Sequence, residues 1–259
     1  MKTKTLILFA PGTNRDGDVA LALELAGAAP SIVPLSDLRE KRVNWLDYQM
    51  LVLPGGFSYA DALGAGKLLA LDLSHYFLDE ATSFVAAGKP VLGVCNGFQV
   101  LVKAGILPGN QAKDETRFST LTYNQGNHFE CRWVTLKPLS QTCLWTKNLE
   151  TLIDCPVAHG EGNFQTIDPS QAQNLFTRDQ VALIYTYANG QPASGKYPQN
   201  PNGSLFDIAG ICNTAGNVLG LMPHPEDHVF PFQTPDRFRR SGFSGLPLFE
   251  NGVRFAAGL

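Results

Sequence analysis

Short apolar runs separated by turn-forming residues recur along the first part of the chain. Each run is dominated by Leu, Ile, Val or Met, which is the pattern of a strand buried on both faces. Between the runs, apolar residues recur at helical spacing. The predicted strands are residues 6–10, 31–35, 49–53 and 90–94, and the predicted helices are residues 16–27, 61–73, 76–87 and the segment after Cys95. This alternation predicts an α/β fold with a mostly parallel sheet flanked by helices.

The pattern changes from about residue 110 onward. Residues 129–136 alternate between apolar and polar side chains, which predicts a half-exposed strand. Further short strands are predicted at residues 152–153, 157–158 and 181–185, followed by a hairpin of residues 207–211 and 218–222. Together they predict an antiparallel elaboration beside the parallel sheet, within a single domain of residues 1–259. Residues 189–203 are rich in turn formers and predict a long loop, which could be a lid, a contact surface or a spacer.

Composition narrows the classes of partner. The 259 residues carry a net charge of −3, with 44% hydrophobic and 17% charged residues, which are ordinary values for a globular enzyme. A surface for nucleic acid or an anionic membrane would require clustered Lys and Arg, so we expect neither partner. The five cysteines are scattered and include no C-x-x-C pair, which favours a reduced, cytoplasmic protein. The first apolar run is too short for a signal peptide, and no run has membrane-spanning length.

One cysteine stands at a predicted junction between a strand and a helix. Cys95 is flanked by Gly93 and Gly97 in the spacing G-x-C-x-G. This is the cysteine counterpart of the G-x-S-x-G elbow, in which small neighbours permit a strained backbone that presents the nucleophile. The helix start behind it supplies amide donors and partial positive charge. We interpret Cys95 as a candidate nucleophile, against the alternative of an ordinary buried cysteine.

A histidine and a glutamate follow the last predicted strand. His224 and Glu226 alternate with Pro223 and Pro225, and an extended chain would direct both side chains to the same face. A histidine oriented by a carboxylate can take the proton of a cysteine and later protonate a leaving amine. The alternative is a satisfied surface histidine beside a solvated glutamate.

A pair of glycines offers the third part of an active site. Gly55, Gly56 and Phe57 follow the predicted strand 49–53. The glycines allow a backbone N–H to turn toward the elbow, where it and the amide of Asn96 could hold the oxygen of a tetrahedral intermediate. A Gly-Gly pair alone is usually only a turn. With Cys95 and His224 in the same chain, however, the set provides a nucleophile, oxyanion donors and an oriented base.

These residues resemble the class I, or triad, glutamine amidotransferases over nearly the whole chain. The cysteine elbow and His224-Pro225-Glu226 are shared by the class. The resemblance covers residues 11–14, 53–61, 88–101, 158–163, 202–204, 208–211 and 216–226. Within the class, residues 54–59, 159–163 and 202–204 select the glutaminase subunits that serve purine biosynthesis.

The resemblance implies a flavodoxin-like fold and hydrolysis of the glutamine side-chain amide through a thioester at Cys95. It places oxyanion donors at Gly56 or Phe57 and at Asn96. It also implies that Gln99 and the segment that contains His159, Gly160 and Glu161 line the glutamine pocket or a synthetase interface.

The same resemblance implies a division of labour between chains. Ammonia would pass to a synthetase subunit, with or without a small bridging subunit, where ATP and Mg activate formylglycinamide ribonucleotide. This chain has no nucleotide-binding motif, so we expect no cofactor and no metal on it. The spare histidines and cysteines also lack the spacing of zinc ligands.

Three features depart from the family pattern. Residues 63–66, Leu-Gly-Ala-Gly, stand where the family commonly has an Arg and a Cys, and Asp227-His228 follows Glu226 where many members have Arg. The tail at residues 229–245, with Arg237, Arg239 and Arg240, is longer than in short members. None of these positions belongs to the triad, so we expect them to affect how a partner docks.

Three alternatives stay open at this point. The chain could serve another synthetase. It could be a different Cys-elbow hydrolase of the same sheet type, such as a peptidase or deglycase relative. It could also be a binding subunit without catalysis, although Cys95, His224 and Glu226 are all present.

Overall fold

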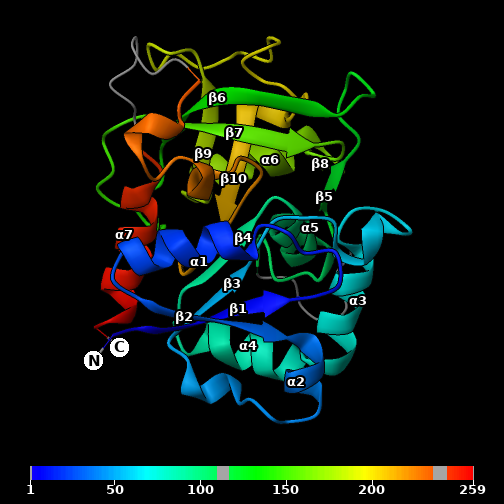
Figure 1. Ribbon diagram of the computed structural model, residues 1–259. Helices are drawn as coiled ribbons and strands as arrows, with labels where there is room; N and C mark the ends of the chain where they lie inside the picture. The colour runs from blue at the N-terminus through cyan, green and yellow to red at the C-terminus, as the bar shows by residue number, and fades with distance from the viewer. Residues whose placement is uncertain (1, 110–116, 236–243, 259) are drawn as a thin grey trace.

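One mixed sheet organises the computed structural model, which describes residues 2–109, 117–235 and 244–258. Within these residues nine strands pair in the order β2-β1-β3-β4-β11-β10-β9-β6-β7 (Figure 1). The strands are β1 Lys4–Phe9, β2 Ala29–Pro34, β3 Met50–Leu53, β4 Val91–Val94, β6 Glu130–Pro138, β7 Ile153–His159, β9 Val181–Thr186, β10 Ile208–Cys212 and β11 Val218–Leu221. Strands β5 Ser119–Thr122 and β8 Asn163–Thr166 form a separate antiparallel pair.

The sheet has two regions with different connectivity. Strands β2, β1, β3, β4 and β11 are all parallel to their neighbours in this group. Strands β10, β9, β6 and β7 continue the same sheet with antiparallel pairing. The structure therefore confirms the predicted α/β class with a parallel sheet and an antiparallel elaboration.

Helices cover the parallel region. They are α1 Asp16–Leu25, α2 Leu35–Arg39, α3 Lys67–Tyr76, α4 Leu78–Ala86, α5 Asn96–Lys103 and α7 Leu246–Ala256. Helix α6 Pro169–Thr177 instead packs against β8 and residues 205–207. Helix α1 packs against α7, whereas α5 packs against α3 and lies under β3, β4 and β11. In Figure 1, α1 lies in front of these strands and α5 behind them. The central strands are consequently covered on both faces, and β3, β4 and β11 are buried at every position.

Short helical turns connect several of these elements. They are η1 Trp45–Asp47, η2 Ser58–Asp61, η3 Leu205–Asp207, η4 Pro225–Asp227 and η5 Pro231–Gln233. Two of these turns, η2 and η4, adjoin the candidate site. Within the described residues, no helix combines the length and the apolar character that crossing a bilayer requires.

Several sequence predictions need correction. The helix predicted at residues 61–73 begins only at Lys67, because Asp61, Leu63, Gly64 and Gly66 have positive φ angles that an α-helix excludes. The two short strands predicted at residues 152–153 and 157–158 are one strand, β7. Helices α2, α6 and α7 and the strand pair β5 and β8 were not predicted.

Other predictions are confirmed or fall outside the described residues. Residues 189–203 contain no helix or strand, as predicted. Of the tail at residues 229–245, residues 236–243 lie outside the described residues, and Arg237, Arg239 and Arg240 are among them.

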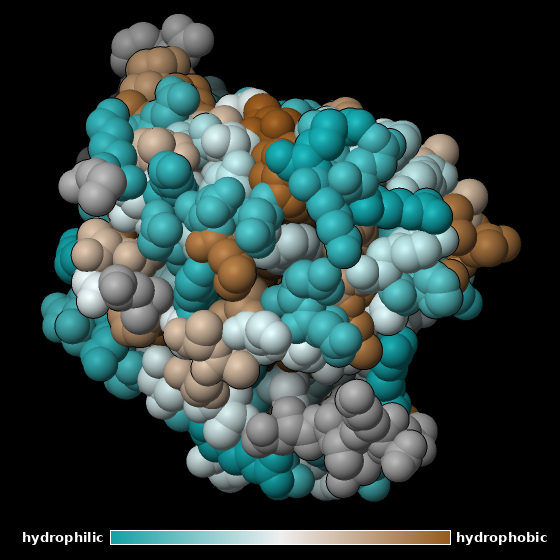
Figure 2. All heavy atoms as spheres, turned by 90° about the horizontal axis from the view of Figure 1, so that it is seen from below, coloured by the Kyte–Doolittle hydropathy of each residue, from teal (hydrophilic) through white to brown (hydrophobic). Residues whose placement is uncertain are grey.

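Figure 2 shows the molecule from below, with hydrophobic residues in small groups separated by hydrophilic ones. This mixture is ordinary for a face exposed to water.

Candidate active site

Cys95 lies between β4 and α5, at the predicted corner. Its φ of 49° and ψ of −103° are unfavourable for a residue with a side chain. Two glycines make the corner possible: a Cβ at Gly93 would lie 2.5 Å from the Leu101 side chain, and one at Gly97 would lie 1.9 Å from the Leu53 carbonyl oxygen. The backbone is therefore strained where the thiol is presented, as in a nucleophile elbow.

His224 reaches the same edge of the sheet from the neighbouring strand. Strands β4 and β11 are parallel, and Leu221 pairs with Val94. Cys95 follows Val94 directly, while His224 comes three residues after Leu221, so both emerge at the carboxyl ends of adjacent strands. The His224 N–H donates to the Pro156 carbonyl oxygen at 2.8 Å, which fixes the backbone.

Glu226 orients the His224 ring. His224 Nδ1 lies 2.7 Å from Glu226 Oε1, and the two side chains are 3% and 0% exposed. Because a carboxylate only accepts, Nδ1 is the donor, and the lone pair or proton at Nε2 is left for Cys95. The backbone differs from the prediction: residues 225–227 form the turn η4 rather than an extended chain. Pro225 explains this difference, since its fixed φ suits the first helical position.

Electrostatics favour a protonated His224. Burial acts to lower its pKa, but the charge of Glu226 and the charge and hydrogen bonding of Cys95 outweigh burial, so the pKa of His224 is raised well above its usual value. Within the described residues, His224 Nε2 is buried and makes no hydrogen bond of good geometry. The Cys95 thiol donates to the Ala158 carbonyl oxygen at 3.8 Å, so His224 Nε2 is left available for proton transfer.

The loop after β3 determines which amides can face the elbow. Phe57 N–H donates to the Gly12 carbonyl oxygen at 2.9 Å, so it is not available as an oxyanion donor in this conformation. Gly56 has a φ of +137°, and no described residue accepts from its amide. Asn96 is the first residue of α5, where the N–H has no acceptor within the helix. Of the two predicted options in this loop, the Phe57 amide is engaged and the Gly56 amide is not, so Gly56 and Asn96 stay as the predicted pair of donors.

A side chain at position 55 would collide with the histidine. A Cβ at Gly55 would lie 2.7 Å from Cε1 of His224. The first glycine of the pair thus makes room for the ring, which is a role that the sequence alone did not indicate.

A cavity of about 170 Å³ opens beside the Cys95 thiol. Its walls contain Cys95, the loop after β3 with Gly56 and Phe57 (the oxyanion loop), helix α5 and the end of β7. The lining residues are Gly56, Phe57, Asp61, Ala65, Cys95, Gln99, Tyr123, Phe129, Ala158, His159, Gly160 and Glu161. All the residues that the resemblance assigned to the glutamine pocket, namely Gln99, His159, Gly160 and Glu161, therefore lie around one cavity.

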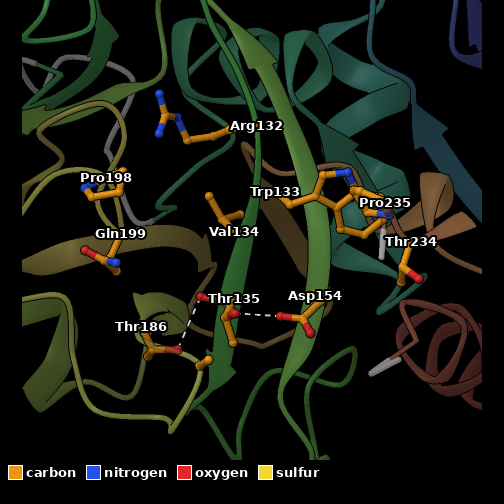
Figure 3. A pocket seen from close by; sticks show the side chains of 11 residues that line it. Arg132, Trp133, Val134, Thr135, Asp154, Thr186, Pro198, Gln199, Thr234 and Pro235 are labelled. Carbon is orange, nitrogen blue, oxygen red and sulfur yellow. Dashed lines mark hydrogen bonds between the residues drawn. The ribbon is translucent and has the colours of Figure 1, made fainter. Parts of the chain in front are cut away.

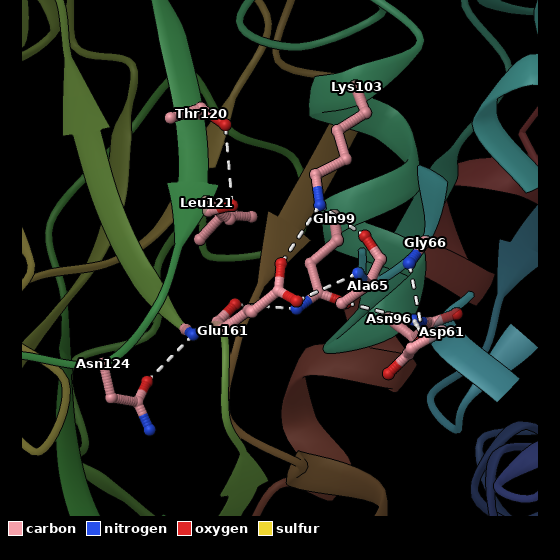
Figure 4. Close-up of polar contacts among 11 residues, drawn as sticks. Asp61, Ala65, Gly66, Asn96, Gln99, Lys103, Thr120, Leu121, Asn124 and Glu161 are labelled. Atoms are coloured by element: carbon pink, nitrogen blue, oxygen red, sulfur yellow. Dashed lines mark hydrogen bonds and ion pairs between the residues drawn. The ribbon is translucent and has the colours of Figure 1, made fainter. Parts of the chain in front are cut away.

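Gln99 and Glu161 are linked across this cavity (Figure 4). Gln99 Nε2 donates to the backbone oxygen of Glu161 at 2.7 Å. The Glu161 carboxylate accepts from the Ala65 N–H at 3.1 Å and forms an ion pair with Lys103 at 3.4 Å. These contacts join α5 to the segment after β7, so the two walls are held at a fixed separation.

His159 is a neutral, structural histidine in this conformation. Asn124 Nδ2 donates to the carbonyl oxygens of His128 and His159, so Asn124 Oδ1 must accept from His159 Nδ1 at 3.1 Å and from Gly162 N–H at 2.9 Å. Burial, together with the charge of His224, lowers the pKa of His159 to about 3. Its side chain therefore carries no charge at neutral pH and anchors the Gly160 segment.

Asn202 and Ser204 secure the same segment from the long loop. Asn202 Nδ2 and Ser204 Oγ both donate to the Gly162 carbonyl oxygen, at 2.8 and 3.3 Å. Asp207 accepts from the backbone amides of Ser194 and Gly195 at 2.6 and 2.8 Å. The loop at residues 189–203 is thus tied to the pocket wall. Sequence analysis gave no role to Asn124 or Asn202, because nothing local links either residue to a partner about 40 positions away.

A second cavity lies on the antiparallel region, away from the cysteine. It has a volume of about 340 Å³ and is lined by strands β6 and β7 and by neighbouring loops (Figure 3). Its polar groups bond to one another: Thr135 Oγ1 donates to Asp154 at 2.5 Å, and Thr186 Oγ1 donates to the Thr135 carbonyl oxygen at 3.2 Å. Its described lining residues include neither a cysteine nor a histidine, so the smaller cavity at Cys95 is the candidate active site.

Comparison with known proteins identifies relatives of the whole chain. The family described as the CobB/CobQ-like glutamine amidotransferase domain matches residues 2–256. The phosphoribosylformylglycinamidine synthase subunit PurQ of Treponema denticola is 60% identical over 241 residues, which are 88% of this chain and 89% of the relative. The PurQ subunit of Dehalococcoides mccartyi is 41% identical and covers 98% of both chains.

A solved structure shares both the sequence and the fold. A chain in the structure of PurLQS from Thermotoga maritima is 31% identical, with a TM-score of 0.75, and the match covers 98% of this chain and 99% of that one. Because both the family match and these relatives extend over nearly the full length, the chain belongs to the glutamine amidotransferase family described as CobB/CobQ-like and, within it, to the PurQ subunits of phosphoribosylformylglycinamidine synthase.

Proposed function

We propose that this chain is the glutaminase subunit of a phosphoribosylformylglycinamidine synthase. It hydrolyses glutamine to glutamate and ammonia as one amidotransferase domain spanning residues 1–259. It delivers the ammonia to a synthetase subunit for amidation of formylglycinamide ribonucleotide in purine biosynthesis. The observation that carries the proposal is the placement of Cys95 and of the His224 and Glu226 pair at the carboxyl ends of the adjacent strands β4 and β11. Cys95 and Gly56 there line a cavity.

In the first half of the reaction, Cys95 Sγ attacks the side-chain amide carbon of glutamine. The carbonyl oxygen takes the negative charge and receives hydrogen bonds from the Gly56 and Asn96 amides. His224, protonated at Nε2 with the thiol's proton, gives that proton to the amide nitrogen. The carbon–nitrogen bond breaks, ammonia leaves, and a glutamyl thioester remains on Cys95.

In the second half, water attacks the thioester carbon. His224 takes a proton from the water, and the same two amides hold the oxygen of the second tetrahedral intermediate. The carbon–sulfur bond breaks, the proton returns to sulfur and glutamate leaves. Glu226 keeps the imidazole oriented throughout and stabilises its positive charge.

The walls of the cavity suit a free amino acid. Gln99, Gly160 and Glu161 would orient the α-amino and α-carboxylate groups of glutamine, because they supply an amide, a peptide and a carboxylate to the lining of the cavity. We propose no metal and no cofactor on this chain; ATP and Mg belong to the synthetase. The five cysteines, all unpaired, are consistent with a cytoplasmic location.

The partners follow from the relatives. The structure that contains a similar chain is named PurLQS, and the curated relatives are named as subunits of the synthase. We therefore propose a synthetase subunit as partner, together with a small bridging subunit.

A reconstitution experiment tests the proposal. The chain is assayed for glutamate release alone and with the synthetase subunits of its own organism, and glutamine-dependent formation of phosphoribosylformylglycinamidine is measured in parallel. We expect synthesis to require this chain when glutamine is the nitrogen source. Failure with these subunits, together with success on a different synthetase, would assign the chain to another amidotransferase.

A further inference from the structure

The turn η2, directly after the oxyanion loop, has an unusual backbone. Tyr59, Ala60 and Asp61 have φ angles of 54°, 55° and 51°, so three successive residues with side chains are left-handed. Such a conformation is unfavourable for residues with side chains and normally occurs at single positions. A run of three persists only where the surroundings impose it, and such strain concentrates at functional sites.

Contacts from two directions impose this turn. Tyr59 N–H donates to the Pro11 carbonyl oxygen at 2.6 Å, and Tyr59 Oη donates to Asp72 at 2.5 Å. Ala60 N–H and Ala62 N–H close the turn on the carbonyl oxygens of Phe57 and Tyr59. The turn is thereby bonded to the loop after β1 on one side and to α3 on the other.

Two side chains of the turn, those of Ser58 and Asp61, form hydrogen bonds with the side chain of Asn96, the residue after Cys95. Ser58 Oγ donates to Asn96 Oδ1 at 2.6 Å, and the Ser58 N–H points at the same oxygen at 3.3 Å. Asn96 Nδ2 donates to Asp61 Oδ1 at 3.1 Å and to Gln99 Oε1 at 3.1 Å, as Figure 4 shows for Asp61 and Gln99. Ser58 and Asn96 are 1% and 2% exposed, so these bonds are shielded from competing water.

The Asn96 side chain therefore joins the two sides of the oxyanion site. Its own backbone N–H is one of the proposed donors, and Ser58 is two residues after Gly56, whose N–H is the other. We infer that Ser58 and Asp61 are positioning residues for glutamine hydrolysis, which lock the Asn96 and Gly56 amides at the separation that the oxyanion requires. This inference rests on the proposed function.

The partners also fix the direction of the Asn96 amide. Asp61 Oδ1 and Gln99 Oε1 both accept, so the Nδ2 side of Asn96 must face them and the oxygen must face Ser58. Asp61 is held in turn by the Gly66 N–H at 3.4 Å. Asp61 thus orients the Asn96 side-chain amide by accepting from Nδ2, and Ser58 does so by donating to Oδ1.

Replacement of Ser58 tests the inference. Ser58→Ala removes the shorter of the two bonds between the donor segments and leaves only the 3.3 Å contact of the residue 58 N–H. We expect kcat for glutamine hydrolysis to fall roughly 10–100-fold, somewhat less than for loss of a donor itself. KM should change less than about threefold, because the Gln99 and Glu161 side of the cavity is untouched. Asp61→Ala should resemble Ser58→Ala, whereas Asp61→Asn, which can still present an acceptor to Asn96, should recover most of kcat.

Ser140→Ala is the matched control. Ser140 is also fully buried and also donates from its hydroxyl, to the Asp179 carbonyl oxygen at 2.6 Å, but neither residue lines the cavity at Cys95. Its kcat should stay at the wild-type value. Equal losses in Ser140→Ala and Ser58→Ala would show that reduced stability, rather than oxyanion geometry, lowers kcat.

Two measurements separate this inference from the proposed function. Alkylation of Cys95 by iodoacetamide, followed by mass spectrometry of its peptide, forms no oxyanion and should proceed at the wild-type rate in Ser58→Ala. Amide hydrogen exchange over residues 54–62 should accelerate at least tenfold in Ser58→Ala and stay unchanged in Ser140→Ala. Unchanged exchange, or a kcat within twofold of wild type, overturns the inference even if the chain proves to be a glutaminase. A chain that hydrolyses no glutamine would refute the proposed function. In that case the exchange measurement would still show whether Ser58 holds residues 54–62 in place.

Discussion

The parallel and antiparallel regions of the sheet build the candidate site in different ways. The parallel region places Cys95 and His224 directly after adjacent strands, β4 and β11, whose pairing fixes where each residue emerges. The antiparallel region places His159 at the end of β7 and then relies on side chains, chiefly Asn124 and Asn202, to hold the segment that follows. One half of the site is thus set by backbone pairing and the other by buried side-chain hydrogen bonds.

This difference predicts which substitutions should affect turnover and which should affect glutamine binding. Residues set by strand pairing carry the proposed bond-breaking steps, so their replacement should remove turnover while the fold stays intact. Residues set by side-chain networks shape the pocket, so their replacement should weaken glutamine binding first.

The most severe change is at the nucleophile. Cys95→Ala removes the sulfur that forms the thioester, and we expect glutamine-dependent synthesis by the reconstituted complex to fall below detection. Ammonia-dependent synthesis should remain, because the synthetase is a separate chain. If both nitrogen sources fail with a correctly assembled complex, the proposed division between the chains is wrong.

Loss of the base should be the next largest effect. His224→Ala removes the proton carrier, and we expect kcat for glutamine hydrolysis to fall by roughly a thousandfold or more. Steady-state kinetics with the synthetase present measure the effect. Activity near the wild-type value would mean that another group takes the Cys95 proton.

A smaller effect is expected from the antiparallel region. Asn124→Ala leaves His159, Gly162 and two carbonyl groups without a partner, so the pocket wall should loosen and KM for glutamine should rise roughly tenfold, with a smaller change in kcat. Asn251→Ala is a suitable control, because Asn251 Nδ2 also bonds two carbonyl oxygens, at 3.2 and 2.9 Å, but on α7. A loss of kcat alone in Asn124→Ala would contradict the separation of roles.

The smallest effect concerns stability against pH. The pKa of His224 is raised in the folded state despite burial, mainly by Glu226, whereas in the unfolded chain it is near the usual value of about 6.5. The stabilisation from this pair is therefore fully present below about pH 6.5 and is lost as the pH rises through the folded pKa. In Glu226→Gln, the free energy of unfolding should depend less on pH above this value, by up to about 1.4 kcal/mol per pH unit.

Urea unfolding at a series of pH values measures that slope. The wild-type chain should lose stability from neutral to alkaline pH more steeply than Glu226→Gln. Parallel curves would mean that the carboxylate does not hold a proton on His224.

Sequence reasoning found the parts of the site that depend on neighbours along the chain. The Cys95 corner follows from Gly93, Gly97 and the apolar strand before them, and those signals lie within a few residues of one another. Gln99 and Glu161 came only from the resemblance to a family. Nothing in the local pattern of either residue indicates that they bond across a cavity, because 62 positions separate them.

The failures have equally specific causes. Residues 61–73 have helical periodicity, yet left-handed residues occupy the first turn because tertiary contacts of Tyr59 and Asp61 override local propensity. The Phe57 amide was predicted as a possible oxyanion donor, but in the structure it donates to the Gly12 carbonyl oxygen. That contact is not visible in the local sequence. The prediction of an extended segment from His224 to Glu226 was wrong. Pro225 disfavours the interior of a helix, but its fixed φ is compatible with the first turn of one, and it begins η4.

The pairing of Leu221 with Val94 has a consequence for protein engineering. Since the ladder between two adjacent strands sets the spacing of thiol and imidazole, the surrounding connections could be shortened, cut or rejoined without altering that spacing. An enzyme that is split or circularly permuted at a distant surface turn should still bring Cys95 and His224 together. Shifting β11 by a single residue, by contrast, would turn His224 to the opposite face and abolish its role in proton transfer.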